Sequence, residues 1–146
     1  MATDMTDLFQ ALYDRYRFFD EAWDAYTLTG GRFYRAQAPD AAVQEGPIVV
    51  VSQTGGNINA MFSKDTLEEV MLQMAVYDQF RNDASRASRV MKSLIAIFEY
   101  ATFVIPAAEA FVCMRREGMQ LESIEDRTHV QIVQNWMLTQ HVPAWR

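Results

Sequence analysis

Apolar residues near the N-terminus recur at alternating steps of four and three, which is the spacing of one face of an α-helix. They are Met5, Phe9, Leu12, Tyr16, Phe19, Trp23 and Tyr26. Thr3 or Thr6 can cap the start of this helix, and Gly30-Gly31 can end it through the backbone freedom of glycine. The pattern predicts a helix from Met5 to Tyr26 that lies on a sheet or on other helices, with a coiled-coil seam as the alternative.

A second helix is predicted near the middle of the chain by seven apolar residues that form one stripe. The stripe consists of Ala87, Val90, Met91, Leu94, Ile97, Phe98 and Ala101. Asn82 or Asp83 is a natural N-cap in front of it. We therefore expect an amphipathic helix from about Ser85 to Tyr100.

The segment between these two helices carries strand-like patterns. Arg32 to Arg35 can form a short strand, and the β-branched run from Ile48 to Ser52 directly after a proline predicts a buried one. Proline and glycine between residues 38 and 47 predict a loop that separates them. Thr54 to Asn57 predicts a turn, after which Ile58 to Phe62 is expected to return as one arm of a hairpin.

The secondary structure of the remaining segments is harder to predict from their patterns. Leu67 to Phe80 fits both a helix and a strand, so its periodicity leaves the choice open. Glu122 to Thr128 is expected to be a polar linker. Val130 to Thr139 mixes polar and apolar residues as an edge strand does, with a final helix as the alternative.

Composition indicates one folded domain made in a reducing compartment. The chain has 146 residues, half of them hydrophobic, which excludes a mainly disordered protein. Its one cysteine, Cys113, cannot form an internal disulfide. The residues from Met1 to Asp4 lack the basic and apolar blocks of a signal peptide. We expect synthesis and assembly in the cytoplasm.

Charge and hydropathy argue against two kinds of partner. The formal net charge of −6 opposes wrapping around a phosphate backbone, so specific DNA binding is not expected. The apolar stretch from Leu94 to Met114 contains Glu99 and Glu109 and is interrupted by Pro106, so it predicts two elements joined by a turn and no membrane span.

No residue pattern indicates catalysis, a cofactor or a metal site. The two histidines, His129 and His141, and the single cysteine lack the spacing of metal ligands or of a nucleophile with its base. Cys113 lies in an apolar stretch and is expected to be buried. Arg115 and Arg116 can bind an anion, but in a strand they face opposite sides of the sheet. An enzyme is not expected.

Several motifs together resemble the tail-terminator, or tail-completion, proteins of long-tailed bacteriophages. The motifs are Gly30-Gly31-Arg32-Phe33-Tyr34, the Ala38-Pro39 turn, Pro47-Ile48-Val49-Val50-Val51 before Thr54-Gly55, the acid-Val-apolar-Gln-apolar pattern in Glu69 to Asp78, Phe111 to Glu117, and Glu125-Asp126 to Leu138. They cover nearly the whole chain as patterns and not as invariant residues. The closing segment is more amide-rich than in the family, and the residues after His141 have no counterpart.

The resemblance implies a single α+β domain over residues 1–146, with an N-terminal and a central helix packed on a mostly antiparallel sheet. Residues 140–146 are a candidate flexible tail. It also implies a strand at Leu67 to Phe80, and a structural subunit of the virion that closes into a ring, typically a hexamer. Such a ring caps the tail tube, stops its growth and takes part in head-tail joining, while DNA passes through it. The implied partners are further copies of the chain, the tail tube protein and the neck connector.

Two groups of residues are the candidate interaction sites. Asn57, Met61 and Phe62 lie beside the glycine turn and can reach a neighbouring subunit or the tube, although Met61 and Phe62 can equally fold back onto their own core. Arg115 and Arg116 form the second group. The alternative functions are a neck or head-completion protein of the same virion and a helical adaptor of a bacterial cytoplasm.

Overall fold

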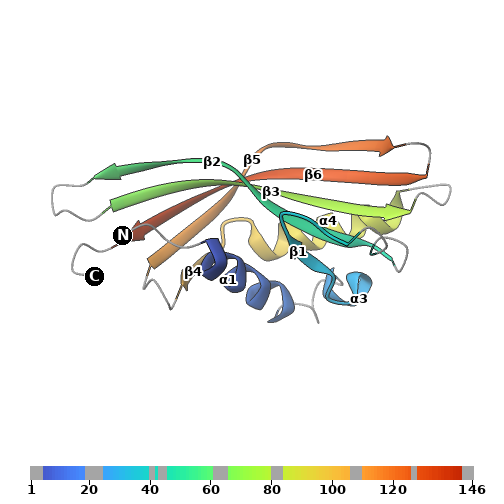
Figure 1. Cartoon of the computed structure of the whole chain (residues 1–146), viewed down its shortest axis with the longest axis horizontal. Coiled ribbons are helices and arrows are strands. Elements are labelled where there is room, and N and C mark those ends of the chain that lie inside the picture. The colour runs from blue at the N-terminus through green and yellow to red at the C-terminus, as the bar shows by residue number, and fades with distance from the viewer. Residues whose placement is uncertain are drawn as a thin grey trace.

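The computed structural model describes residues 5–18, 25–39, 42, 46–60, 66–79, 84–105, 110–125 and 128–142. In chain order the elements are α1 (Met5–Phe18), α3 (Ala25–Thr29), β1 (Phe33–Arg35), β2 (Ile48–Ala60), β3 (Thr66–Gln79), α4 (Ser85–Phe98), β4 (Thr102–Ile105), β5 (Ala110–Glu125) and β6 (His129–Val142). The helices gather on one side of the sheet (Figure 1). The predicted α+β class is confirmed, and the prevalence of strands contradicts the helical adaptor. No helix in these ranges is long and apolar enough to cross a membrane.

One six-stranded sheet has the order β1-β2-β3-β6-β5-β4. The β1–β2 pair is parallel and the other pairs are antiparallel. The sheet curls strongly, and the β2–β3 hairpin projects to the left beyond the helices in Figure 1. Because β6 lies between β3 and β5, the expectation that this segment is an edge strand or a helix is wrong. Its strand continues through residues 140–142.

The two central strands owe their form to alternation of buried and half-buried residues. From Val130 to Gln140 every even-numbered residue of β6 is buried and every odd-numbered one is half-buried. The strand β3 alternates in the same phase except at Ala75, which is also buried, and its register with β6 aligns the two buried rows, as in Leu72 opposite Trp136. Successive side chains of a strand point to opposite faces, so one face is apolar enough to form a core. The strand implied for Leu67 to Phe80 is confirmed.

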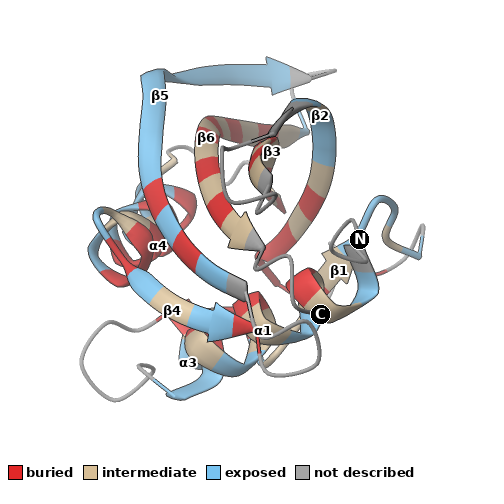
Figure 2. Ribbon diagram, turned by 90° about the vertical axis from the view of Figure 1, so that its left-hand side faces the viewer, coloured by how far each residue is buried: buried red, intermediate tan, exposed pale blue. Residues whose placement is uncertain are grey.

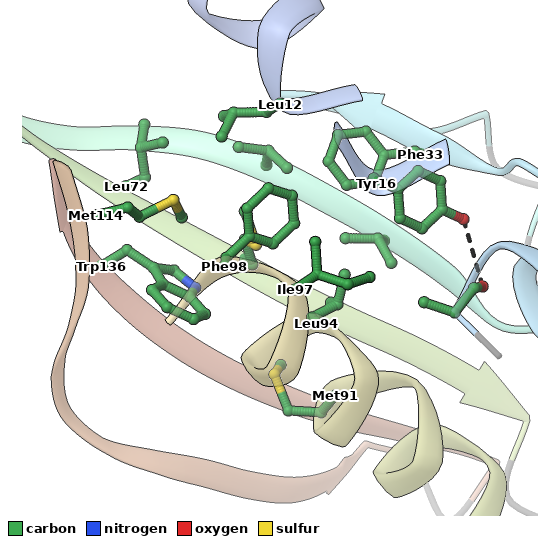
Figure 3. Packing of buried hydrophobic residues seen from close by; sticks show 14 of the residues in the cluster. Leu12, Tyr16, Phe33, Leu72, Met91, Leu94, Ile97, Phe98, Met114 and Trp136 are labelled. Atoms are coloured by element: carbon green, nitrogen blue, oxygen red, sulfur yellow. Dashed lines mark hydrogen bonds between the residues drawn. The ribbon is translucent and has the colours of Figure 1, made fainter. Parts of the chain in front are cut away.

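The helix α4 covers that buried face. All seven residues of the predicted apolar stripe are buried. Phe98 meets Trp136 edge to face, with ring centroids 6.3 Å apart (Figure 3). Leu94 and Ile97 lie on the same helix, before Phe98 in the chain, and belong to the same buried cluster. Interlocking of the helix stripe with the apolar rows of β3 and β6 is the centre of the fold.

The start of α4 is held by an ion pair instead of a side-chain cap. Its N-cap residue is Ala84, with no capping hydrogen bond from the side chain, and the expected caps Asn82 and Asp83 lie outside the described residues. Arg86 Nε donates to Asp78 Oδ2 at 2.8 Å, and Arg86 Nη2 donates to Oδ1 at 2.6 Å. The hydrogen bond to Asp78 raises the pKa of Arg86. This fork ties the first turn of α4 to the end of β3.

The N-terminal segment does not form the single helix that its periodicity predicts. In a continuous helix Tyr16 and Thr29 would lie roughly 20 Å apart. Instead the Tyr16 hydroxyl and Thr29 Oγ1 are hydrogen-bonded, so α3 folds back against α1 (Figure 3). Gly30 and Gly31 have positive φ and end α3, as predicted. Arg15 Nε donates to the carbonyl of Ile97 at 3.0 Å and joins α1 to the end of α4.

Two predicted breaks in the sheet are also wrong. The segment from Thr54 to Asn57 does not turn the chain, because β2 runs on to Ala60 with only a register shift between Gln53 and Gly55. Glu122 to Glu125 belongs to β5 and is not a linker. A glycine pair can be accommodated in a strand as a bulge, which local sequence does not distinguish from a turn.

Truncation of Trp136 should test the central contact. We expect Trp136→Ala to lower the free energy of unfolding by about 3–5 kcal/mol, because the indole is fully buried against α4. Chemical denaturation monitored by circular dichroism measures this change. Met119→Ala is the matched control, since Met119 is 86% exposed and should change the free energy of unfolding by less than about 0.5 kcal/mol. Equal effects of the two substitutions would contradict this description of the core.

Candidate interaction surfaces

Among the residues that the structure describes, no strand pairs with the outer edge of β2 over most of its length. The short strand β1 covers β2 only from Val49 to Val51. From Gln53 to Ala60, β2 pairs with β3 on one side, and no described strand lies on its other side. Asn57 lies in this segment, opposite Glu69. Met61 and Phe62 lie outside the described residues, between the two strands of the hairpin.

The close approach of β2 and β3 in this arm depends on Gly56. A Cβ at Gly56 would lie 2.6 Å from the carbonyl oxygen of Glu69, whereas a Cβ at Gly55 would meet only the Met71 sulfur at 3.9 Å. The two glycines therefore have different roles. Gly56 lets the two backbones meet, and Gly55 lies at the register shift with space around it.

The outer half of β5 is the most exposed part of the sheet. Every residue from Arg115 to Ile124 is exposed, and this half of β5 stands away from the helices in Figure 2. Met119, Leu121 and Ile124 are 86%, 67% and 50% exposed. The strand β4 covers β5 only from Ala110 to Cys113, so beyond it β5 is a second open edge within the described residues.

A bulge divides this half of β5. Glu117 pairs with Asn135 and Leu121 with Val133, so residues 118–120 face the single residue Gln134. Gly118 has a φ of 79° and can adopt it because glycine has no Cβ. Gln134 is fully buried, and its Nε2 donates to the carbonyls of Gly118 at 3.1 Å and Asn135 at 2.9 Å. An isolated glycine in an otherwise strand-like run was the one sequence signal that could have revealed this bulge.

Arg115 and Arg116 are separated as the alternation of a strand predicts. The Arg116 guanidinium binds the Glu99 carboxylate, with Nε and Nη2 at 2.9 and 2.8 Å from Oε1. Arg115 instead lines a shallow hollow of about 290 Å³, together with Tyr100, Thr102, Cys113, Met114 and Thr139. Asn57 and the two arginines do not form one cluster. Asn57 lies on β2 and the arginines lie on β5, and these strands are toward opposite sides of the sheet.

The groups that could carry chemistry lie apart. The expectation that Cys113 is buried is wrong, because Cys113 is exposed on the face opposite the helices. His129 and His141 occupy opposite ends of β6. Among the residues that the structure describes, no group of three His, Cys, Asp or Glu side chains could hold a metal ion.

Comparison with known proteins finds this fold among solved structures but not among curated sequences. No protein-family model and no curated protein sequence matches the chain. Solved structures do match it. One is a chain of the virion of a native gene transfer agent particle, which superimposes with a TM-score of 0.66 at 15% identity and covers 92% of this chain and 94% of that one. The two proteins therefore share a fold over nearly their whole lengths.

The two glycines of the β2 arm provide a matched test of its geometry. Gly56→Ala should lower the free energy of unfolding by about 1–3 kcal/mol, because the added methyl group would clash with the backbone of Glu69. Gly55→Ala should leave the free energy of unfolding unchanged or slightly raised, since its Cβ makes an ordinary contact. Thermal unfolding of both variants measures the difference. A neutral Gly56→Ala variant would contradict the close approach of the strands.

Proposed function

We propose that this protein is a structural subunit of a tailed-phage type of virion, and that it forms the ring that ends the tail tube and takes part in joining it to the head. The observation that carries this proposal is the shared fold, over nearly the full length of both chains, with a chain of a gene transfer agent virion. The resemblance of the sequence motifs to tail-terminator proteins supports the more specific role.

The surface of the isolated chain is suited to assembly. Specific interfaces between proteins bury roughly 1,200–2,000 Å² and have apolar centres. The described surface offers Phe111, Met119 and Leu121, each at least 60% exposed, at or near the edges of the sheet. A ring needs one head-to-tail interface that is repeated around an axis until it closes. We expect six copies, by analogy with the family that the sequence resembles.

Charge suits a channel for DNA. The formal net charge of −6 gives a passing duplex few phosphate-neutralising contacts, so the polymer can slide without being held. Assembly in the host cytoplasm, followed by a permanent place in the virion, completes the proposed role.

A neck or head-completion protein of the same virion is the alternative, because such proteins can share a fold and differ in their surfaces. Negative-stain electron microscopy of the purified protein with isolated tail tubes distinguishes the two roles. A tail terminator should cap one end of each tube as a ring. Rings that bind only head connectors would favour the neck role, and a protein that stays monomeric with both partners would contradict a ring-forming subunit.

We further propose that the end of the β2–β3 hairpin contacts a neighbouring subunit or the tube. Met61→Asp combined with Phe62→Asp should abolish rings and leave a folded monomer, because two charges would have to be desolvated in an apolar contact. Size-exclusion chromatography with light scattering measures the oligomer, and circular dichroism measures the fold. Phe18→Asp is the control, since Phe18 is 80% exposed at the end of α1. An unchanged oligomer in the double variant would exclude this role for the hairpin.

A further inference from the structure

The outer half of β5 changes direction sharply where it lies outside the core. Every residue from Arg115 to Ile124 is exposed, and β5 turns a corner within this stretch (Figure 2). The bulge at residues 118–120 lies in the same stretch, and bulges bend strands. No described member of the buried cluster comes from this half of β5. Its direction therefore contributes nothing to the packing of the single chain.

One buried amide holds the bulge and interrupts the core. The buried row of β6 from Val130 to Leu138 is apolar except at Gln134. Gln134 Nε2 donates to the carbonyls of Gly118 and Asn135, while among the described residues its Oε1 has no hydrogen-bond partner. A buried polar atom without a partner destabilises the folded state. An apolar side chain of similar shape would suit the core better.

Gly118, which accepts one of these hydrogen bonds, serves the bend and not close packing. Its φ of 79° is a value that residues with a side chain rarely adopt, yet a Cβ there would have no other described atom within 4 Å. Gly56 differs, because there a Cβ would clash with the backbone of Glu69. Gln134 and Gly118 thus fix the direction of a segment that the isolated chain leaves unpacked.

We propose that Gln134 is a positioning residue for assembly. Through its hydrogen bond to Gly118 it holds the corner of β5 and directs residues 119–125 onto the next copy of the chain. This inference rests on the proposed ring and assigns to one buried side chain the shaping of a subunit contact. The stability that the amide removes from each chain is offset by the interface that forms in the ring.

The segment beyond the corner has the composition of a subunit contact. It carries three of the seven large apolar side chains that are exposed in the described part of the chain, at Met119, Leu121 and Ile124. Such side chains form the centres of specific interfaces. Glu117 to Glu125 contains three acids and no base, so a basic rim would complement it. Another copy can supply that charge, because Arg35 of β1 and Lys92 of α4 are exposed.

Two buried glutamines on one strand provide the test and its control. Gln140 is also fully buried in β6, and among the described residues neither polar atom of its amide has a hydrogen-bond partner. Gln134→Met and Gln140→Met each replace a buried amide by an apolar side chain of similar length. Only Gln134→Met removes the hydrogen bond to the bulge. The exposed Gly118 carbonyl that it releases can bond to water.

We expect both methionine variants to be at least as stable as the wild type in thermal unfolding. The protein concentration needed for half-maximal ring formation should rise about tenfold or more for Gln134→Met and less than about twofold for Gln140→Met. Light scattering over a dilution series measures ring formation by the protein alone. Counts of capped ends in negative stain measure it with tail tubes present.

A second pair of variants tests the bend itself. Asparagine adopts positive φ far more readily than the β-branched valine, and both side chains would enter open space at Gly118. Gly118→Asn should therefore assemble within about threefold of the wild-type concentration, and Gly118→Val should assemble as poorly as Gln134→Met. Equal assembly by the two Gly118 variants would overturn the inference.

Three further results would overturn the inference and leave the ring function intact. They are a Gln134→Met variant less stable than the wild type, which would show that the amide serves the core, ring formation by that variant at the wild-type concentration, and an equal loss of assembly in both methionine variants. A wild-type protein that never forms rings, even with tail tubes, would instead overturn the proposed function and this inference together.

Discussion

The register between β3 and β6 is the constraint on which the rest of the structure depends. Their pairing runs from Thr66 opposite Val142 to Gln79 opposite His129 without a shift. The buried residues of the two strands therefore lie on one face, and α4 packs its apolar stripe against them. A slip of one residue would transfer one strand's buried row to the other face. The strands β2 and β5 pair with the outer sides of this central pair, and α4 packs on its buried face.

The departures from regular sheet geometry occur in the outer strands. The shift at Gln53/Gly55 lies in β2, and the bulge at residues 118–120 lies in β5, while β3 and β6 remain regular. Bulges bend a strand and increase its twist. These irregularities are confined to β2 and β5, so the regular pair β3–β6 can remain rigid while the outer strands bend. The buried Gln134 connects the two, since its side chain leaves the central strand to bind the bulge of β5.

Local pattern predicted those elements in which one face is buried by a single partner layer. The stripe of α4 is the example, because burial of one face imposes its period directly on the sequence. The run from Ile48 to Val51 was predicted instead by its β-branched composition. The same reasoning failed for the N-terminal segment. There Tyr16 and Tyr26 fit a single helical face, but they pack against each other with ring centroids 5.6 Å apart because α3 folds back onto α1. Cys113 was misjudged for a related reason: an apolar stretch in a strand has two faces, and alternation left the thiol on the exposed one.

The sequence alone determined the α+β class, the central helix, the absence of any recognisable catalytic pattern and a resemblance to proteins that assemble, since these depend on composition, periodicity and order of motifs. Only the tertiary structure decided that β6 is central, that Gly55 and Gly56 continue a strand, and that parts of β2 and β5 have no covering strand among the described residues. Strand order and exposed edges depend on pairings between residues far apart in the chain. Neighbouring residues carry no record of such pairings, so local sequence cannot specify which surfaces remain open to a partner.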